Sequence, residues 1–266
     1  MFNKFPLTPK SPLNPLFQRW ERISAQVFIL LLMSFACTSQ AANVQTILNK
    51  ADSYRLPEET VQVKTRVDLY KSGQLDKTRH YNVYIKPGRR SLVIFKSAVE
   101  RGQKVLMLND KFWIVMPKSR RPIRITPMQK LLGEASTGDI ATMTWSEDYD
   151  GYVSGKEMIN NIPCLKLALH TIRRGTTYAR IELYVAQDGY WPVKANFYMA
   201  SGKLAKRAYF TLTEVEGRKQ VKAMTLYDKI QRQRQTVIRY LSLTPRSIPD
   251  KFYNPMYLVR NRLQGW

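Results

Sequence analysis

The sequence is poor in the residues on which most catalytic and metal sites depend. It has only two cysteines, Cys37 and Cys164, and two histidines, His80 and His170, which lie far apart in the chain. No HExxH pair, GxSxG elbow, phosphate-binding loop or GxGxxG turn occurs. A hydrolase of this size usually shows a recognisable nucleophile and base, so the sequence argues against an enzyme. We also expect no metal and no cofactor, and we expect both histidines to be structural or surface residues.

Acidic residues are also scarce, because Lys and Arg outnumber Asp and Glu by 43 to 20 and give a formal net charge of +23. Such a charge usually indicates nucleic acid or an anionic surface as partner. The N-terminus favours the second, since a basic segment leads into the apolar run "AQVFILLLMSFA" and then into "TSQAAN". This order is typical of a secretory signal peptide, and the run is too short to span a membrane. We therefore predict a signal peptide over residues 1–41 and an anionic membrane surface, not nucleic acid, as partner. An uncleaved anchor is the alternative.

The two cysteines are expected to differ in fate. Ser34 stands where a lipoprotein signal normally has Leu, three residues before Cys37, so cleavage near Ala41 is favoured over lipid attachment. The mature chain then keeps only Cys164, which excludes an intramolecular disulfide. Because "IPCLKLALH" is apolar and offers no evident base, we predict that Cys164 is a small core residue.

The hydrophobic period changes early in the mature chain. In "ANVQTILNKADSYRL", Ile47, Leu48 and Ala51 follow the spacing of an amphipathic helix, which Pro57 ends. Apolar and polar residues then alternate almost to the C-terminus, as in strands with one buried face. A second helical turn is expected at "PMQKLLGE", residues 127–134. The expected strands, about ten in number, lie within residues 61–70, 78–86, 91–97, 104–117 (a hairpin), 162–170, 179–187, 190–200, 203–215, 219–230 and 235–243.

These patterns predict a mainly β protein with few helices, in a single domain over residues 42–266. A meander of this many strands must curl, and its apolar face needs a cover. We therefore expect a strongly curved antiparallel sheet, a half-open β-barrel, capped by helices around an apolar cavity. The alternative is an ordinary dry core. The expected cavity residues are Val63, Val67, Val83, Ile85, Phe95, Trp113, Leu167, Leu183, Val193 and Phe197.

One stretch, "GDIATMTWSEDYDGY" at residues 138–152, gathers acids in this basic chain. Its acids are Asp139, Glu147, Asp148 and Asp150. A calcium loop counted from Asp148 would need Gly at its sixth position, where Val153 stands. A glycosidase with paired carboxylates stays formally open. The favoured interpretation is a polar loop whose Asp residues cap short turns.

A basic cluster, "KSRRPIR" at residues 118–124, follows one of the expected strands. Its cations are Lys118, Arg120, Arg121 and Arg124. We expect either a surface for a membrane or partner, or a strand edge that charge protects from pairing.

Taken in order, four segments resemble the outer-membrane lipoprotein-sorting proteins of the LolA-like superfamily, in the branch associated with RND-type or MMPL-type transporters. They are "KFWIVMPKSRRPIRITPMQKLLG", "TGDIATMTWSEDYDGY", "GYWPVKANFYMASGKLAKR" and "IPDKFYNPMYL". The resemblance covers most of residues 44–260. It rests on Trp113, Pro117, Arg120, Arg121, Arg124, Gly138, Asp139, Asp148, Tyr149, Ile248, Pro249, Phe252 and Leu258.

The resemblance implies a LolA/LolB-like fold and a periplasmic, monomeric carrier without enzymatic activity. It would hold the acyl chains of a lipid or lipoprotein and move them between an inner-membrane transporter of the RND or MMPL type and the outer membrane. Gly138, Asp139, Asp148 and Tyr149 would form a signature loop near the cavity mouth. The alternative is a periplasmic regulatory protein on the same fold that senses lipoproteins or envelope stress.

Overall fold

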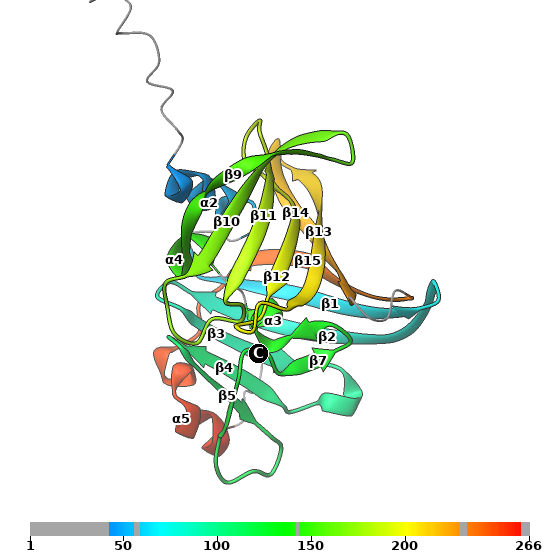
Figure 1. Cartoon of the computed structure of the whole chain (residues 1–266). Helices are drawn as coiled ribbons and strands as arrows, with labels where there is room; N and C mark the ends of the chain where they lie inside the picture. The colour runs from blue at the N-terminus through cyan, green and yellow to red at the C-terminus, as the bar shows by residue number, and fades with distance from the viewer. Residues whose placement is uncertain (1–42, 56–58, 142–143, 229–232, 262–266) are drawn as a thin grey trace, which may run out of the picture. The chain divides into compact units, whose positions relative to one another are not determined.

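Strands β1 (Val61–Lys71) and β15 (Arg234–Pro245) join two antiparallel meanders into one sheet, which has 13 strands in the described part of the chain. The computed structural model describes residues 43–55, 59–141, 144–228 and 233–261. The sheet order is β6-β5-β4-β3-β2-β1-β15-β14-β13-β12-β11-β10-β9. In the described part of the chain, the end strands β6 and β9 do not pair with each other, so the curved sheet stays open (Figure 1). The predicted half-open curved sheet is confirmed.

The remaining strands follow the chain closely within each meander. The first meander contains β2 (Gln74–Lys86), β3 (Arg90–Phe95), β4 (Lys104–Leu108), β5 (Lys111–Val115) and β6 (Ile123–Ile125). The second contains β9 (Tyr149–Ile159), β10 (Ile162–Thr171), β11 (Arg180–Ala186), β12 (Pro192–Tyr198), β13 (Leu204–Val215) and β14 (Arg218–Asp228). A separate hairpin of β7 (Lys130–Leu132) and β8 (Ala135–Ser136) lies between the meanders in sequence.

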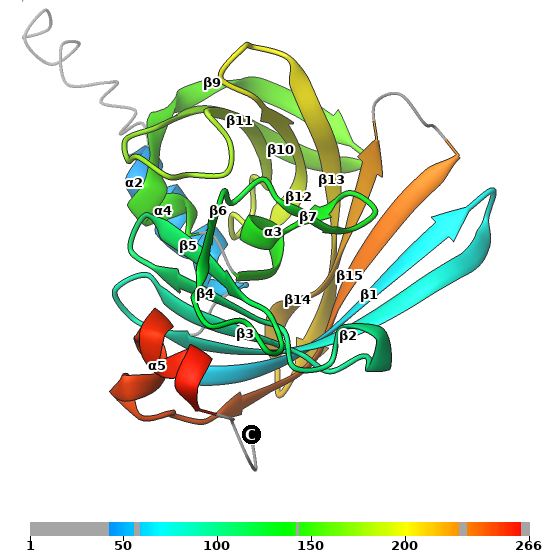
Figure 2. The same ribbon diagram turned by 90° about the horizontal axis from the view of Figure 1, so that it is seen from below.

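Within the described residues, three helices cover the concave side and are called the inner helices: α2 (Val44–Ser53), α3 (Thr137–Ala141) and α4 (Trp145–Asp148). Figure 2 shows α3 inside the curve of the sheet. The predicted first helix is confirmed as α2. The Asn43 side chain caps its N-terminus by accepting from Gln45 N at 3.1 Å, and Ile47 and Leu48 are fully buried.

Strand register assigns each side chain to a face, because cross-strand partners in an antiparallel sheet point the same way. Val63 pairs with Val83, and both are buried on the concave face. Gln62 pairs with Tyr84 on the convex face, where its amide donates to the tyrosine hydroxyl at 3.0 Å. The convex face is therefore not simply solvated at this position.

A second apolar layer covers part of the convex face. Helix α5 (Pro255–Arg260) and the 3₁₀ turn η2 (Asp250–Tyr253) pack on it, with Leu258 fully buried. Lys104 Nζ donates to the carbonyl of Leu258 at 2.9 Å, which satisfies an end of α5. The sheet residues beneath α5 and η2 are Tyr84, Leu92, Ile94, Leu106 and Val115.

The helix predicted at residues 127–134 is wrong. The segment forms the β7–β8 hairpin, which turns at Gly133 with φ +54°. A Cβ at Gly133 would lie 2.3 Å from the hydroxyl of Thr236, so the hairpin approaches β15 too closely for any side chain. The helix comes later, at α3, inside the acidic stretch.

Strand β9 and helix α5 are among the other elements that were not expected from the sequence. Strand β9 begins inside the acidic stretch, where glycines and charges obscure the alternation. Helix α5 has a start signal in "NP": Asn254 Oδ1 accepts from Met256 N at 2.9 Å, and Pro255 occupies the first turn.

The chain separates into Met1–Ala42 and Asn43–Trp266. The predicted signal peptide lies outside the described residues and stays a prediction. Among the described residues, no helix has both the length and the apolar content needed to cross a bilayer.

Candidate functional site

The acidic stretch contains a buried ion pair. Asp139 Oδ2 lies 2.8 Å from Lys206 Nζ, which projects from β13. The same oxygen accepts from the backbone N–H and hydroxyl of Ser136 at 2.8 and 2.7 Å. The other carboxylate oxygen accepts from the Tyr178 hydroxyl at 2.8 Å. The interpretation of this stretch as a polar loop is therefore wrong at Asp139, which bonds α3 to the second meander.

The charge states within this cluster follow from its contacts. Burial raises the pKa of Asp139, but Lys206 and the hydrogen bonds from Ser136 outweigh it and hold this pKa below its ordinary value. Burial, reinforced by Asp139, raises the pKa of Tyr178 well above its ordinary value. At neutral pH the carboxylate is therefore ionised and the phenol is a neutral donor.

Other members of the signature loop meet the same connection between β10 and β11. A Cβ at Gly138 would lie 2.0 Å from the hydroxyl oxygen of Thr177, so a larger residue fits there only if Thr177 is moved or replaced. The Tyr149 hydroxyl donates to the carbonyl of Tyr178 at 2.9 Å. The Tyr149 carbonyl accepts from Gln45 of α2 at 3.0 Å. Gly138, Asp139 and Tyr149 thus converge on residues 177–178.

Asp148, the fourth member, forms a buried ion pair with Arg89 of the turn between β2 and β3. Arg89 also lies 3.4 Å from Asp110 of the turn between β4 and β5. From the other side, Arg173 Nε donates to the carbonyl of Glu147 at 2.7 Å. Helix α4, directly before β9, is consequently linked to both meanders.

Asp52, which the sequence patterns did not single out, attaches α2 to α4. Its carboxylate accepts from Trp145 N at 3.1 Å and from the N–H and hydroxyl of Ser146, both at 2.8 Å. Burial raises the pKa of Asp52, opposed by Arg55 and by the bonds from Ser146. The carboxylate supplies the cap that Thr144 does not provide for α4.

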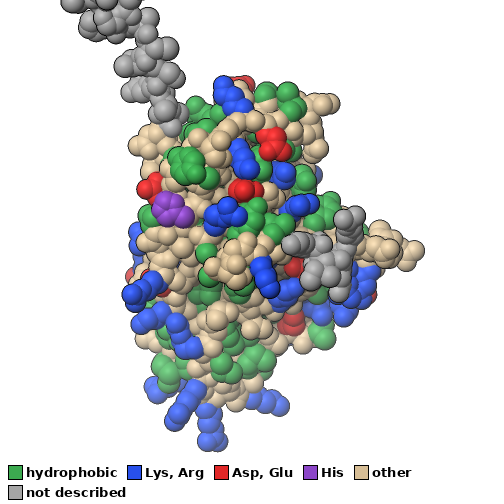
Figure 3. Space-filling model, viewed as in Figure 1, with side chains coloured by type: hydrophobic (Ala, Val, Ile, Leu, Met, Phe, Trp, Pro, Cys, Tyr) green, Lys and Arg blue, Asp and Glu red, His purple; other side chains and the backbone are tan. Residues whose placement is uncertain are grey.

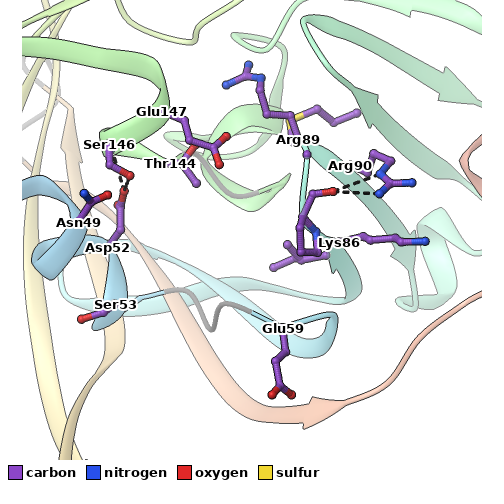
Figure 4. A pocket seen from close by; sticks show the side chains of 14 residues that line it. Asn49, Asp52, Ser53, Glu59, Lys86, Arg89, Arg90, Thr144, Ser146 and Glu147 are labelled. Carbon is purple, nitrogen blue, oxygen red and sulfur yellow. Dashed lines mark hydrogen bonds between the residues drawn. The ribbon is translucent and has the colours of Figure 1, made fainter. Parts of the chain in front are cut away.

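A pocket of about 470 Å³ opens between α2, the β2–β3 turn and the start of α4, and is called the mouth pocket (Figure 4). Its walls are mixed, with Ile85, Pro87 and Met107 beside charged groups of both signs. The lining residues are Asn49, Asp52, Ser53, Glu59, Ile85, Lys86, Pro87, Gly88, Arg89, Arg90, Met107, Thr144, Ser146 and Glu147.

Ile85 also lines a small interior cavity of about 10 Å³ between the sheet and α3. Val63 and Val83 of the sheet and Ile140 of α3 contribute to its wall. Trp145 fills the neighbouring space, edge-on to Phe210 with ring centroids 5.6 Å apart. Side chains of α3 and α4 therefore fill the space beside this cavity.

Comparison with known proteins identifies the family. A family model described as "Uncharacterized protein" matches residues 88–260. The crystal structure of a LolA superfamily protein from Nitrosomonas europaea is 30% identical, with a TM-score of 0.75, over 82% of this chain and 100% of that one. The chain belongs to the LolA superfamily. A comparison with curated proteins gave no match.

Two more distant structures share the fold of this LolA superfamily chain. A DUF1329 family protein from Desulfovibrio piger is 20% identical, with a TM-score of 0.66, over 80% of this chain and 97% of that one. A proposed outer membrane lipoprotein-sorting protein domain from Vibrio parahaemolyticus is 18% identical, with a TM-score of 0.65, over 81% and 98%. The curved sheet with inner helices is thus the superfamily fold.

Most of the residues predicted to line the cavity of the LolA-like fold lie on its concave face. Val63, Val83 and Ile85 line the interior cavity. The others on this face are buried: Val67, Phe95, Leu167, Leu183 and Phe197. Tyr178 stacks on Phe197 with ring centroids 4.4 Å apart. These residues are therefore buried on the concave face, and their role as the lining of a lipid cavity stays a prediction.

Trp113 and Val193 depart from the expected lining. Trp113 pairs with Leu106 and packs in the convex cluster under α5, because β5 places it on the opposite face from Phe112. Val193 is the extra residue of a bulge in β12 and packs with Cys164 and Tyr184. A bulge shifts the alternation by one residue, which sequence periodicity does not reveal.

The remaining predicted residues fall outside this interior. In the basic cluster, Lys118, Arg120 and Arg121 are exposed on the connection between β5 and β6, and Arg124 is exposed on β6. Cys164 is a free, fully buried core residue, as predicted. His80 and His170 are both exposed. Within the described ranges, no group of three or more His, Cys, Asp or Glu side chains is placed to hold a metal ion.

Proposed function

We propose that this protein is a periplasmic carrier that holds the acyl chains of a lipid or lipoprotein between the concave face and the inner helices. The observation that supports this proposal is the way in which the inner helices, which form a lid over the concave face, are attached to the domain. The inner helices pack on an apolar face, and two buried ion pairs attach α3 and α4 to the rest of the domain: Asp139 with Lys206 and Asp148 with Arg89. A lid of this kind can leave as a unit without unfolding the sheet.

The mouth pocket is the proposed entrance. It shares Ile85 with the interior cavity, so displacement of α3 and α4 would join the two spaces. The present cavity of about 10 Å³ is too small for an acyl chain. The incoming chain would therefore take the place of Ile140 and Trp145 against the sheet.

Energetics make a shuttle role reasonable. Burying a chain of about sixteen carbons is worth roughly 12 kcal/mol, at about 0.8 kcal/mol per CH₂. A membrane offers the chain a similar gain, so transfer is nearly neutral. The direction must then come from differential affinity at the donor and acceptor. We propose an inner-membrane transporter of the RND or MMPL type as donor and the outer membrane as destination. The assignment of the Vibrio parahaemolyticus domain to outer membrane lipoprotein sorting supports lipoprotein as a cargo class.

The decisive experiment locks the lid with a disulfide between Gly138→Cys and Thr177→Cys. A Cβ at Gly138 would lie 3.1 Å from the Thr177 Cβ, slightly less than the span of about 3.5–4.5 Å in disulfides, so α3 must shift by a few tenths of an ångström. Uptake of a pyrene-labelled hexadecanoyl probe is measured before and after reduction. We expect the oxidised protein to take up no probe and the reduced protein to recover it.

Thr177→Cys alone is the matched control, and it should bind the probe equally under both conditions. Equal uptake by the locked and reduced proteins would overturn entry beneath the inner helices. If wild-type protein takes up no probe and carries no extractable lipid from the cell envelope, the carrier proposal is wrong and the regulatory alternative gains.

Localisation is tested separately. We propose export with removal of residues 1–41, and N-terminal sequencing of the periplasmic protein should begin near Ala42. An intact leader in the membrane fraction would contradict this proposal.

A further inference from the structure

The connection between β5 and β6 carries an unneutralised cluster of positive charge. From Lys111 to Gly133 the sequence has no acidic residue. We call residues 116–124 the basic loop. Its exposed cations are Lys118, Arg120, Arg121 and Arg124. None of them forms an ion pair with an acid of the described chain.

The basic loop has a defined shape. Ser119 N donates to the carbonyl of Met116 at 3.1 Å, and Arg121 N donates to the Ser119 hydroxyl at 3.3 Å. Pro117 packs against the turn before β4, since a Cβ at Gly102 would lie 3.2 Å from its ring. The exposed Arg101 of that turn therefore adds a neighbouring cation. The charges are held on one projection of the surface rather than dispersed.

An apolar side chain lies within this charge. Ile123 is 52% exposed, between Arg121 and Arg124 in the sequence. The guanidinium carbon of Arg124 lies over the ring of Trp113, 4.6 Å from the ring centroid. The Arg124 side chain therefore does not cover Ile123. Cations beside an exposed aliphatic side chain match the boundary between lipid phosphates and acyl chains.

Protection of a strand edge explains the cluster less well. Strand β6 has only three residues, and of the loop cations only Arg124 lies on it. A protective charge would also not require an exposed isoleucine. Figure 3 shows Lys and Arg side chains gathered at the lower end of the domain, where this loop lies in Figure 1, without acidic side chains among them.

We propose that the basic loop docks the protein on an anionic bilayer surface, with its cations on lipid phosphates and Ile123 at the acyl boundary. A bilayer is favoured over an acidic protein because the loop projects from the domain and forms no groove. Mobile lipids can also adjust to unevenly spaced cations, which a fixed acidic surface cannot. This proposal does not depend on acyl chains entering the interior.

The test is co-sedimentation with vesicles of phosphatidylcholine, with and without about one third phosphatidylglycerol, at low and high salt. Wild-type protein should bind the anionic vesicles at low salt. Arg120→Glu with Arg121→Glu should lower the affinity at least tenfold, because each nearby cation adds about fivefold. Arg218→Glu with Lys222→Glu changes the charge equally on exposed residues of β14 and should have less than a threefold effect. Unchanged melting temperatures confirm that both variants are folded.

Ile123→Ser separates the apolar contribution. It should leave binding at low salt nearly intact and abolish the binding that survives at high salt. Equal losses in the loop and β14 variants would show that net charge alone acts, which overturns the proposal. Equal binding to neutral vesicles would also overturn it. A photo-crosslinker at position 120 that captures an envelope protein but no lipid in cells would assign the loop to an acidic protein partner instead.

Discussion

Lys206 and Asp139 form an ion pair 2.8 Å long beneath the concave face, with side chains that are only 3% and 0% exposed. Each charge has left water and depends on the other for compensation. A pair of this kind contributes little net stability relative to an apolar pair, but either residue alone is costly to bury. The pair therefore fixes where α3 sits more than it stabilises the fold.

Removal of one partner of this ion pair should destabilise the folded protein strongly. We expect Lys206→Met to lower the free energy of unfolding by about 3–5 kcal/mol, because Asp139 is left buried without its cation. Lys206→Met with Asp139→Asn should recover at least about 1 kcal/mol of this loss. Urea unfolding measures both. Lys130→Met is the control: this lysine pairs with Glu134 but is 60% exposed, so the loss should stay below about 1 kcal/mol.

Acid should weaken the attachment of α3. The pKa of Asp139 lies below its ordinary value of 3.8, so its stabilisation is fully present above that pH and is lost as pH falls through the lower folded-state value. The stability difference between wild type and Asp139→Asn should therefore shrink as the pH falls below about 4. Other carboxylates also affect the stability at acidic pH, so the difference in the free energy of unfolding between the two proteins is the quantity to measure.

For Asp52→Asn, the stability difference from wild type should change with pH in the opposite direction. Burial raises the pKa of Asp52, so protonation as pH falls through that raised value favours the wild-type fold. The advantage of wild type over Asp52→Asn should grow on acidification. If the stability difference from wild type changed in the same way with pH for Asp139→Asn and Asp52→Asn, the opposite pKa shifts of the two aspartates would be ruled out.

Trp145 lies under the concave face and Trp113 lies on the convex face, so substitutions of the two residues test the two faces separately. Trp145→Ala should lower the free energy of unfolding by about 3–5 kcal/mol, since this ring is fully buried against Phe210. It also leaves an apolar cavity under the proposed lid. Hexadecanoic acid should therefore raise the melting temperature of this variant more than that of wild type.

Trp113→Ala removes an indole from the convex cluster and serves as the control. Its melting temperature should not respond to hexadecanoic acid more than that of wild type. A similar response in both variants would indicate binding away from the concave face.

Arg89 pairs with one buried and one exposed carboxylate, so the contributions of the two ion pairs to stability can be compared at a single cation. Asp148 is 4% exposed and Asp110 is 43% exposed, judged by their side chains. Asp148→Asn should lower the free energy of unfolding by about 3 kcal/mol or more, and Asp110→Asn by less than about 1 kcal/mol. Arg89→Lys should fall between them, because a single ammonium cannot reach both carboxylates as the two terminal guanidinium nitrogens do. Equal losses for the two aspartates, measured by chemical denaturation, would contradict a buried pair.

The strands were predictable where alternation was uninterrupted. Val63 and Val67, and likewise Leu167 and Leu169, are buried as their spacing indicates. The pattern failed at bulges and at register shifts. Val193 is displaced by a bulge in β12, and nothing in "YWPVKANFYMA" marks it.

The inner cluster was not predictable from local sequence. Asp139 suggests a solvated loop unless it is known that Lys206, 67 positions later, lies opposite. Asp52 and Ser146 are 94 positions apart, and their bond depends on the placement of α2 under the sheet. Only the family resemblance pointed to Gly138, Asp139, Asp148 and Tyr149 as a set. In the structure three of them meet residues 177–178, and Asp148 pairs with Arg89.

The pairing of β1 with β15 has a consequence for how the chain folds. Each meander forms from strands that are neighbours in sequence, but the seam joins Val61 to Pro245 at one end and Lys71 to Arg234 at the other. Closing so long a loop carries a large entropic penalty, so seam formation should be the slow step of folding. Until then two half-sheets expose unpaired backbone, the form most open to pairing with another molecule.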